Sequence, residues 1–231
     1  MTTIKQVAAV LPAAGVGRRM QSEIPKQYLQ LGDATVLQWT VRALNQDPRV
    51  TKIYIATSAA DPYFSTLHFD SRCTIQRVDG GATRAASVAA GVRAAATDGF
   101  QWVAVHDAAR PCLGAAELSS VLDAALSDSV GALLALPVAD TLKHADGQQR
   151  CDKSIAREYL WQAQTPQVFR TAELLRGWLK FGTEHHEFTD EASVLEALGQ
   201  RPKLVIGRRS NFKITQPGDE EIARLLLVNK E

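Results

Sequence analysis

The sequence predicts an α/β fold in which helices cover both faces of a mainly parallel, twisted sheet. Short apolar runs typical of buried strands alternate with helix-like segments through most of the 231 residues. Such alternation gives βαβ units, because a helix must cross the sheet to join two parallel strands. A glycine-rich turn directly after the first apolar run supports this fold, since ligands bind such sheets at the carboxyl ends of the strands.

The expected strands are continuous apolar runs, of which VAAVL, KIYIAT, WVAVH and ALLAL are the clearest. They cover residues 7–11, 52–57, 75–78, 102–106, 132–136 and 203–206. The expected helices have helical periodicity or many alanines, and they cover 35–45, 84–96, 115–126 and 217 to about 228. Ligand contacts are therefore expected in the loops after Leu11, Val78, His106 and Leu136.

The polar segment 139–154 interrupts this alternation. It reads ADTLKHADGQQRCDKS, and its Asp146-Gly147 pair is a strong signal for a hairpin turn. The segment is either a disordered insertion or a protruding two-stranded β-arm that packs on another surface. Because an isolated hairpin is only marginally stable in water, an ordered arm favours a partner subunit.

Composition and charge bound the remaining possibilities. The chain is 45% hydrophobic and 22% charged, as in ordinary globular proteins, and we treat 1–231 as a single domain. A net charge of +1 gives no global basic field for a nucleic-acid partner. No apolar run is long enough for a membrane span, and the first residues do not form a signal peptide. Three scattered cysteines without zinc spacing favour reduced thiols and a cytoplasmic location.

The turn after the first strand has the residues of a nucleoside triphosphate site. Gly15 and Gly17 allow backbone N–H groups to approach an anion, while Arg18, Arg19 and Lys26 supply positive charge. The Walker pattern is excluded because arginines follow Gly17, and the dinucleotide fingerprint is excluded because Met20 replaces its third glycine. For the glycines alone, a tight strand-to-helix turn remains an alternative.

Two further turns contain candidate ligand contacts. Gly80-Gly81 precedes Thr83 and Ser87, which could face a ligand at a helix N-terminus, although Thr83 could equally be a plain N-cap. Asp107 follows the WVAVH strand, where a carboxylate could hold Mg²⁺ or a ribose hydroxyl. A helix cap or an ion pair with Arg110 is the competing interpretation.

The C-terminal third contains weaker signals. Thr189 is expected to cap a helix, and its hydroxyl could also hold a phosphate. His185 and His186 have no third metal ligand at suitable spacing, so we expect an exposed loop there. Lys213 follows the last strand and could face the site, although most single lysines are merely solvated.

Eight segments together resemble the 2-C-methyl-D-erythritol 4-phosphate cytidylyltransferase family of the non-mevalonate isoprenoid pathway. The matching segments occur in family order between residues 12 and 215, and they are PAAGVGRRM, PKQYL, VDGG, HDAARP, ADTLK, LWQAQTPQ, FTDEAS and NFKIT. The resemblance implies a single-function enzyme with a Rossmann-like fold and a homodimer formed through the 139–154 arm. It also implies cytidylyl transfer from CTP to 2-C-methyl-D-erythritol 4-phosphate, with Mg²⁺ and release of pyrophosphate.

The resemblance also implies roles for individual residues. Catalytic roles, in contact with the triphosphate or the acceptor, fall to Arg19, Lys26, Arg157 and Lys213. The expected nucleotide contacts are Pro12, Ala13, Ala14, Gly15, Gly17, Gly81, Ala82, Ser87, Asp107 and Ala108, with Asp107 also beside the metal. The expected acceptor contacts are Arg110, Thr141, Thr165 and Thr189, and the arm residues Thr141 and Arg157 could come from the neighbouring subunit.

One departure from the family and three alternatives remain. Family members often have an acidic residue after VDGG, where this chain has Ala82 and Thr83, so reading of cytosine would fall to backbone carbonyls and Ser87. The alternatives are a cytidylyltransferase for another polyol phosphate such as ribitol 5-phosphate, a non-catalytic CTP-binding regulatory protein, and an NAD-dependent oxidoreductase. Met20 disfavours the last of these.

Overall fold

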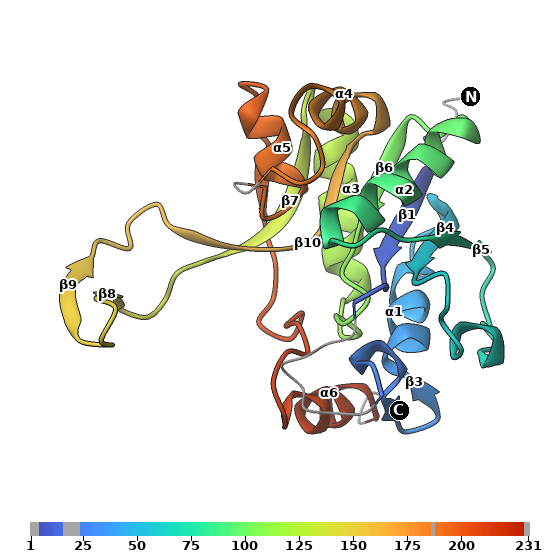
Figure 1. The fold of residues 1–231 in the computed structure, drawn as a ribbon, viewed down its shortest axis with the longest axis horizontal. Coiled ribbons are helices and arrows are strands. Elements are labelled where there is room, and N and C mark those ends of the chain that lie inside the picture. The colour runs from blue at the N-terminus through green and yellow to red at the C-terminus, as the bar shows by residue number, and fades with distance from the viewer. Residues whose placement is uncertain (1–4, 16–23, 186–187, 229–231) are drawn as a thin grey trace.

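A twisted sheet of seven strands forms the centre of the molecule (Figure 1). The computed structural model describes residues 5–15, 24–185 and 188–228. The strands of this sheet are β1 (Val7–Pro12), β4 (Val50–Thr57), β5 (Thr74–Asp79), β6 (Trp102–Val105), β7 (Gly131–Pro137), β10 (Trp161–Arg170) and β11 (Lys203–Ile206). Their order is β11-β7-β10-β6-β1-β4-β5, and every neighbouring pair is parallel except the two that include β10.

Helices cover both faces of the sheet, as the sequence predicts. They are α1 (Val36–Leu44), α2 (Arg84–Thr97), α3 (Ala115–Ser127), α4 (Thr171–Phe181), α5 (Glu191–Ala197) and α6 (Asp219–Val228). Helices α1 and α3 contribute to the hydrophobic cluster on one face, and α2, α4 and α5 to the cluster on the other. Among the described residues, no helix combines the length and the apolar character needed to cross a bilayer.

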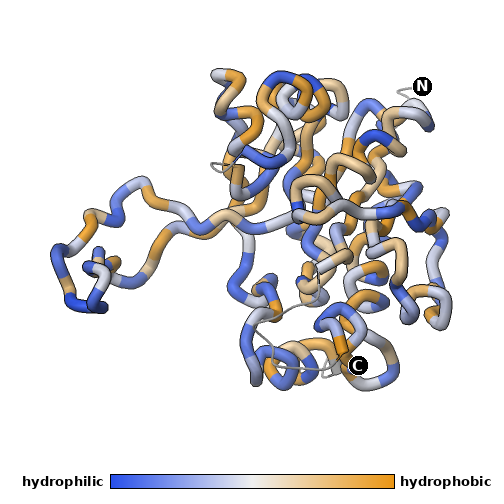
Figure 2. Tube along the Cα trace, in the orientation of Figure 1, coloured by the Kyte–Doolittle hydropathy of each residue, from blue (hydrophilic) through white to orange (hydrophobic). Residues whose placement is uncertain are grey.

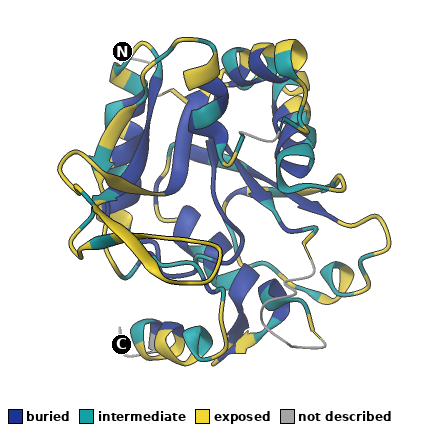
Figure 3. Ribbon diagram, turned by 60° about the vertical axis from the view of Figure 1, so that its left-hand side comes forward, coloured by how far each residue is buried: buried dark blue, intermediate teal, exposed yellow. Residues whose placement is uncertain are grey.

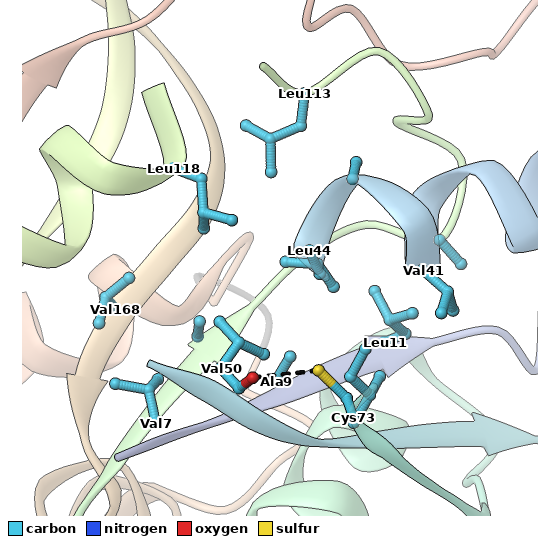
Figure 4. Close-up of a cluster of buried hydrophobic side chains, with 14 of the residues drawn as sticks. Val7, Ala9, Leu11, Val41, Leu44, Val50, Cys73, Leu113, Leu118 and Val168 are labelled. Atoms are coloured by element: carbon cyan, nitrogen blue, oxygen red, sulfur yellow. Dashed lines mark hydrogen bonds between the residues drawn. The ribbon is translucent and has the colours of Figure 1, made fainter. Parts of the chain in front are cut away.

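The strand β1 shows why the core forms on two sides. Its side chains alternate, so Val7, Ala9 and Leu11 enter the cluster with α1 and α3, while Ala8 and Val10 enter the other. All five are fully buried, which explains the continuous apolar run in the sequence. Figure 4 shows the first cluster, in which the thiol of Cys73 donates to the Val50 carbonyl at 3.0 Å.

The sequence analysis contains no counterpart of β10 and α4. Strand β10 lies in the middle of the sheet and runs antiparallel to β6 and β7, although it contains three glutamines and Pro166. Proline cannot donate a ladder hydrogen bond and is normally excluded from central strands. The register with β7 shifts between Ala163 and Gln167, so residues 164–166 bulge out of the ladder. This bulge accommodates the proline and frees its neighbours for other contacts.

Helix starts follow the polar residues in front of them. Thr35 caps α1 in a capping box with Gln38, and Thr83 caps α2 by accepting from the Ala86 N–H. The prediction that Thr189 caps the next helix is wrong, because Asp190 is the N-cap of α5. The Asp190 carboxylate accepts from the Ser193 N–H at 2.9 Å, a bond that the ionised side chain makes more strongly than a hydroxyl.

The polar segment between β7 and β10 projects from the body as a hairpin (Figure 1). Its strands β8 (Leu142–Ala145) and β9 (Cys151–Ile155) are antiparallel and mostly exposed, as Figure 3 shows. The tip is hydrophilic (Figure 2), and Asp146 forms the predicted turn by accepting from the Gln148 and Arg150 N–H groups. The last backbone hydrogen bond between the two ends of the projection runs from the Val138 N–H to the Leu160 carbonyl. The projection therefore extends a few residues beyond the predicted 139–154.

A smaller layer, separate from the two helix layers, lies below the sheet in Figure 1. The hairpin of β2 (Gln30–Leu31) and β3 (Ala34–Thr35) packs with α6 through a separate apolar cluster that includes Leu31, Ile214 and Leu227. The short 3₁₀ helices Lys26–Tyr28 and Phe64–Thr66 complete the described structure. This layer fixes the segment around Ile214 beside the carboxyl ends of β1 and β6, and the functional residues are found there.

Candidate functional site

A cavity of about 410 Å³ opens at the carboxyl ends of β1, β5 and β6. We call it the nucleotide cavity, because every described residue of the expected nucleotide set lines it. These residues are Pro12, Ala13, Ala14, Gly15, Gly81, Ala82, Ser87, Asp107 and Ala108. Three of the four predicted loops therefore meet at one place, as expected for a parallel sheet.

The loop after β1 is held by a residue that the sequence analysis does not single out. The Gln27 side chain is buried, and its amide donates to the Ala13 carbonyl at 2.7 Å and to the Gly15 carbonyl at 3.1 Å. A Cβ on Gly15 would meet no described protein atom, so the described packing does not itself require a glycine at this position. Gly17 and Arg19 lie outside the described residues.

The second glycine turn is required by close packing. A Cβ on Gly81 would lie 2.4 Å from the Cβ of Ala86, and one on Gly80 would lie 2.9 Å from the Ser87 hydroxyl. The Gly81 N–H donates to that hydroxyl at 3.1 Å, and the hydroxyl donates to the Thr83 carbonyl at 2.9 Å. The N-cap interpretation of Thr83 is therefore confirmed, and both Thr83 and Ser87 line the cavity, while their contact with a ligand stays a prediction.

Asp107 lies at the centre of a buried charge cluster. One carboxylate oxygen, Oδ1, accepts from Arg84 Nε at 3.1 Å, and the other, Oδ2, is 3.1 Å from both Arg110 Nε and Lys213 Nζ. Burial alone would raise the pKa of Asp107, but the attraction of Arg84, Lys213 and Arg110 outweighs it. The pKa therefore lies well below its ordinary value, and the side chain is ionised.

These contacts bear on the expected role of Asp107 as a metal ligand. Asp107 is the one acid among the described residues of the nucleotide cavity, and both of its oxygens face cations. No group of three or more His, Cys, Asp or Glu side chains in the described parts of the chain could hold a metal. A Mg²⁺ ion on Asp107 would have to displace Lys213 or an arginine, so the described residues do not fit a metal held by this protein alone.

His106 and Thr165 lie beneath this cluster rather than in the cavity. The Asp107 N–H donates to the Thr165 hydroxyl at 3.0 Å, and this hydroxyl is 2.8 Å from His106 Nδ1. His106 Nε2 is 3.1 Å from the Arg110 carbonyl, which can only accept, so Nε2 bears the proton and Thr165 donates to Nδ1. Burial lowers the pKa of His106 to about 4, so the ring stays neutral, and both of its nitrogens are already hydrogen-bonded.

A second cavity of about 430 Å³ adjoins the first, and we call it the acceptor cavity because Arg110, one of the expected acceptor contacts, lines it. Its charged lining residues are Arg110, Asp140, Arg209 and Lys213, and the end of β7 contributes Leu136 and Pro137. The fourth predicted loop, after Leu136, therefore also reaches the site. Lys213 lines both cavities, and Arg209 is a basic lining residue that the sequence analysis does not name.

The segment that bears Lys213 is fixed to both sides of the site. Lys26, which lines the nucleotide cavity, donates from Nζ to the Ile214 carbonyl at 2.7 Å. The Ile214 N–H in turn donates to the Ala109 carbonyl at 2.9 Å. Arg110 donates to the Asn211 carbonyl at 2.6 Å. Two lysines far apart in the sequence are thereby held beside the turn that follows β6.

Four expected contacts do not line either cavity in this chain. Thr141 and Arg157 lie exposed on the arm, and Thr189 is exposed just before α5. Thr165 is buried, and its hydroxyl is engaged by His106 and the Asp107 N–H. The ring of His185 packs against Phe188 at a centroid distance of 4.7 Å, so this histidine belongs to an aromatic group, while His186 lies outside the described residues.

Comparisons with known proteins agree with this geometry. The family profile of 2-C-methyl-D-erythritol 4-phosphate cytidylyltransferase matches residues 7–229. The chain is similar to the enzyme of that name from Haemophilus influenzae (strain PittGG), with 48% identity over 228 residues covering 98% of this chain and 99% of the relative. The relative of the same name from Enterobacter sp. (strain 638) is also 48% identical, over 98% of this chain and 95% of its own length.

Solved structures are similar over the same length. A crystal structure of 4-diphosphocytidyl-2C-methyl-D-erythritol synthase superposes with a TM-score of 0.84 at 35% identity, covering 96% of this chain and 99% of its own. The cytidylyltransferase of Thermus thermophilus gives a TM-score of 0.79 at 33% identity, covering 96% and 98%. The profile, the sequence relatives and the sheet with its adjoining cavities agree: the chain belongs to the 2-C-methyl-D-erythritol 4-phosphate cytidylyltransferase family and is a nucleotidyltransferase.

Proposed function

We propose that the two cavities divide the reaction, with CTP in the nucleotide cavity and 2-C-methyl-D-erythritol 4-phosphate in the acceptor cavity. The products are 4-diphosphocytidyl-2-C-methyl-D-erythritol and pyrophosphate, in isoprenoid precursor biosynthesis. The observation that supports this division is the position of Lys213, which lines both cavities. A cation at their junction is where two anionic reactants need their mutual repulsion reduced.

The chemistry requires positioning and charge neutralisation rather than proton transfer. An oxygen of the acceptor phosphate attacks the α-phosphorus of CTP, and a new P–O bond forms. The bond between the α-phosphorus and the oxygen that bridges to the β-phosphate breaks, and pyrophosphate leaves with that electron pair. The nucleophile is already ionised near neutral pH, so no general base is needed. The buried, neutral state of His106 agrees with this scheme.

The nucleotide assignments follow the cavity lining. The backbone of Pro12–Gly15, together with Gly81, Ala82, Ser87 and Ala108, would surround cytosine and ribose. Lys26 would face the triphosphate and stabilise the transition state, while the roles of Gly17 and Arg19 rest on the family resemblance. Because Ala82 and Thr83 provide no carboxylate, cytosine selection would depend on backbone groups and Ser87.

The acceptor assignments combine this chain with a second copy. Arg110 and Lys213 line the acceptor cavity and would hold the phosphate. Thr189 lines neither cavity, and its acceptor role rests on the family resemblance. Thr165 would act from below by fixing the backbone of Asp107. Thr141 and Arg157 would reach the cavity of a neighbouring subunit through the 139–154 arm.

The exposed arm supports a homodimer within a single nucleotidyltransferase domain. Its hairpin has little apolar contact of its own, and Tyr159, Leu160 and Trp161 at its base are 86%, 38% and 37% exposed. Exposed apolar residues on a protruding hairpin are typical of a surface that another subunit covers.

Mixing two inactive variants would test the shared site. If Arg157 serves the neighbour, an Arg157→Ala chain and a Lys26→Ala chain form a heterodimer in which one of the two sites is intact. Random exchange would then restore about a quarter of wild-type pyrophosphate release. No restoration, with exchange verified by differently tagged chains, would contradict the shared site.

Two further assignments stay predictions. Mg²⁺ would enter with CTP, bound by phosphate oxygens and water, since the described residues do not fit a metal held by the protein alone. A cytoplasmic location is the second prediction, and the three scattered cysteines without zinc spacing support it, because they favour reduced thiols.

Pyrophosphate release would test the function directly. The purified protein would be given Mg²⁺, each ribonucleoside triphosphate, and either 2-C-methyl-D-erythritol 4-phosphate or ribitol 5-phosphate. We expect release with CTP and the methylerythritol compound. Release with ribitol 5-phosphate instead would move the acceptor assignment to another polyol phosphate. CTP binding without release for any pair would favour a regulatory protein.

A further inference from the structure

A buried carboxylate behind the site is connected to Asp107 through one arginine. Glu191 is the first residue of α5, is 1% exposed and lines neither cavity. Its Oε1 accepts from Arg84 Nη1 at 2.7 Å and its Oε2 from Arg84 Nη2 at 3.1 Å. This bidentate geometry fixes the plane of the guanidinium group as well as its distance.

Arg84 faces a second carboxylate with its remaining nitrogen. Its Nε donates to Asp107 Oδ1 at 3.1 Å, so each of the three guanidinium nitrogens has a carboxylate partner. Arg84 lines the nucleotide cavity and is, by position, a candidate for contact with the triphosphate. However, three of its five N–H groups are already used, and both of its partners are buried. Arg84 therefore connects two carboxylates, Asp107 and Glu191.

The connection continues across Asp107 to the acceptor cavity. Because Arg84 occupies Oδ1, the other oxygen, Oδ2, is left for Arg110 Nε and Lys213 Nζ, each at 3.1 Å. Both of these cations line the acceptor cavity. An ordered series of ion pairs therefore leads from α5 through Arg84 and Asp107 to the groups that face the acceptor.

Glu191, the first residue in this series of ion pairs, is held in place by contacts within the protein. Gln167 on β10 donates to the Asp190 carboxylate at 2.8 Å and accepts from the Ala192 N–H at 2.9 Å. These two bonds hold the residues on either side of Glu191. The central sheet thus sets the position of Glu191, and Glu191 sets that of Arg84.

We infer that Glu191 is a positioning residue for the acceptor side of the reaction, acting through Arg84 and Asp107 on Lys213 and Arg110. It fixes Arg84, which holds one oxygen of Asp107 and directs the other toward the two acceptor-side cations. The inference rests on the proposed assignment of Lys213 and Arg110 to the acceptor. A purely structural ion pair between α5 and α2 would affect folding but would not distinguish the two substrates.

Glu191→Gln would test this, because it keeps the side-chain shape and removes the charge that fixes Arg84. We expect the KM for 2-C-methyl-D-erythritol 4-phosphate to rise roughly tenfold or more, as for loss of a hydrogen bond to a charged group. The KM for CTP should change by less than about twofold. Glu196→Gln is the matched control, since Glu196 is exposed on the same helix, and it should leave both constants unchanged.

A double-mutant cycle with Lys213→Ala would locate the effect. If Glu191 acts through Lys213 and Arg110, the double variant should lose less than the sum of the two single losses, because only the part that passes through Arg110 remains. Independent effects would add in full. Additive losses, an unchanged acceptor KM in folded Glu191→Gln, or an equal rise in both KM values would each overturn the inference. If Lys213→Ala itself leaves the acceptor KM unchanged, the proposed assignment of Lys213 fails instead.

A second variant covers the case in which Glu191→Gln does not fold. Arg84→Lys keeps the positive charge but cannot make the bidentate pair and reach Asp107 at once. The same selective rise in the acceptor KM is expected for this variant. A folded Arg84→Lys protein with normal kinetics would overturn the inference just as directly.

Discussion

The two cavities that share Lys213 are lined by different kinds of residue. The nucleotide cavity is lined mainly by backbone and small side chains, such as Ala13, Gly15 and Gly81, which come from tight turns after parallel strands. The acceptor cavity combines apolar residues with charged and amide side chains, such as Arg110 and Arg209, from segments scattered along the chain. Backbone turns recognise a fixed shape closely, whereas charged side chains must be held in place by further groups.

This difference explains where the supporting contacts lie. On the nucleotide side, one buried amide, Gln27, holds the first loop. The two acceptor-side cations, Arg110 and Lys213, instead share one oxygen of Asp107, whose other oxygen binds Arg84. Thr165 holds the Asp107 N–H, and Glu191 holds Arg84. The acceptor side should therefore be more sensitive to changes away from the cavity surface.

The largest expected effect would come from Lys26→Ala on the nucleotide side. Loss of a preorganised cation at the triphosphate should lower kcat for pyrophosphate release by roughly 10²–10³-fold while the protein stays folded. Lys203→Ala, at an exposed position on β11, serves as the control. A folded Lys26→Ala protein with near-normal kcat would contradict the assignment of Lys26 to the triphosphate.

The free energy of unfolding should depend on pH through His106, which is buried beneath Asp107. The pKa of His106 is about 4, below its ordinary value of 6.5, so the unfolded chain binds more protons than the native chain between these values. The free energy of unfolding should therefore fall as pH drops from 6.5 to 4, by roughly 3 kcal/mol from this group.

Urea unfolding of wild type and His106→Gln across that range would check this. The variant should lose that part of the pH slope, whereas His144→Gln on the exposed arm should retain it. An unchanged slope in His106→Gln would mean that the loss of stability arises elsewhere.

Asp107→Asn should separate the electrostatic role of this residue from a metal-binding role. Without the negative charge, Arg110 and Lys213 lose their common partner, and the acceptor KM should rise roughly 10–100-fold. The Mg²⁺ concentration that gives half-maximal rate at saturating substrates should not change. A marked increase in that Mg²⁺ requirement would instead identify Asp107 as a metal ligand.

The smallest effect is expected for Gln27→Ala. It removes two bonds to loop carbonyls, each contributing about 0.5–1.5 kcal/mol, and should raise the KM for CTP several-fold without changing that for the acceptor. Gln30→Ala, which removes only an exposed bond to the Gly32 carbonyl, is the matched control. An equal change in both KM values would remove the distinction between the two sides.

The sequence was sufficient for the parts of the molecule that depend on local pattern. The strand at 203–206 has the predicted bounds, and the turns at Gly15, Gly81 and Asp107 lie together because parallel strands place their carboxyl ends at one edge. The motif resemblance also named Lys26 and Lys213, and both line the nucleotide cavity. Periodicity and motif order therefore predicted most of the fold and the nucleotide side.

The missed parts depend on contacts between distant segments. Pro166 and the glutamines of β10 contradict the pattern of a central strand, and only the bulge at 164–166 reconciles them. Helix α4 contains Gly177, a weak helix former, which is needed because a Cβ there would lie 2.3 Å from Val194. Nothing local to Arg84 or Glu191 indicates that the two side chains meet.

The backbone hydrogen bond from the Val138 N–H to the Leu160 carbonyl closes the base of the arm. Because β7 and β10 are adjacent antiparallel strands, the whole arm is one long connection between neighbours whose pairing is already set at that bond. The entropy of closing such a connection grows only with the logarithm of its length, by roughly 0.6 kcal/mol for each doubling. The arm can therefore lengthen, shorten or change sequence at little cost to the sheet, so that the subunit pairing proposed for it could change without altering the fold.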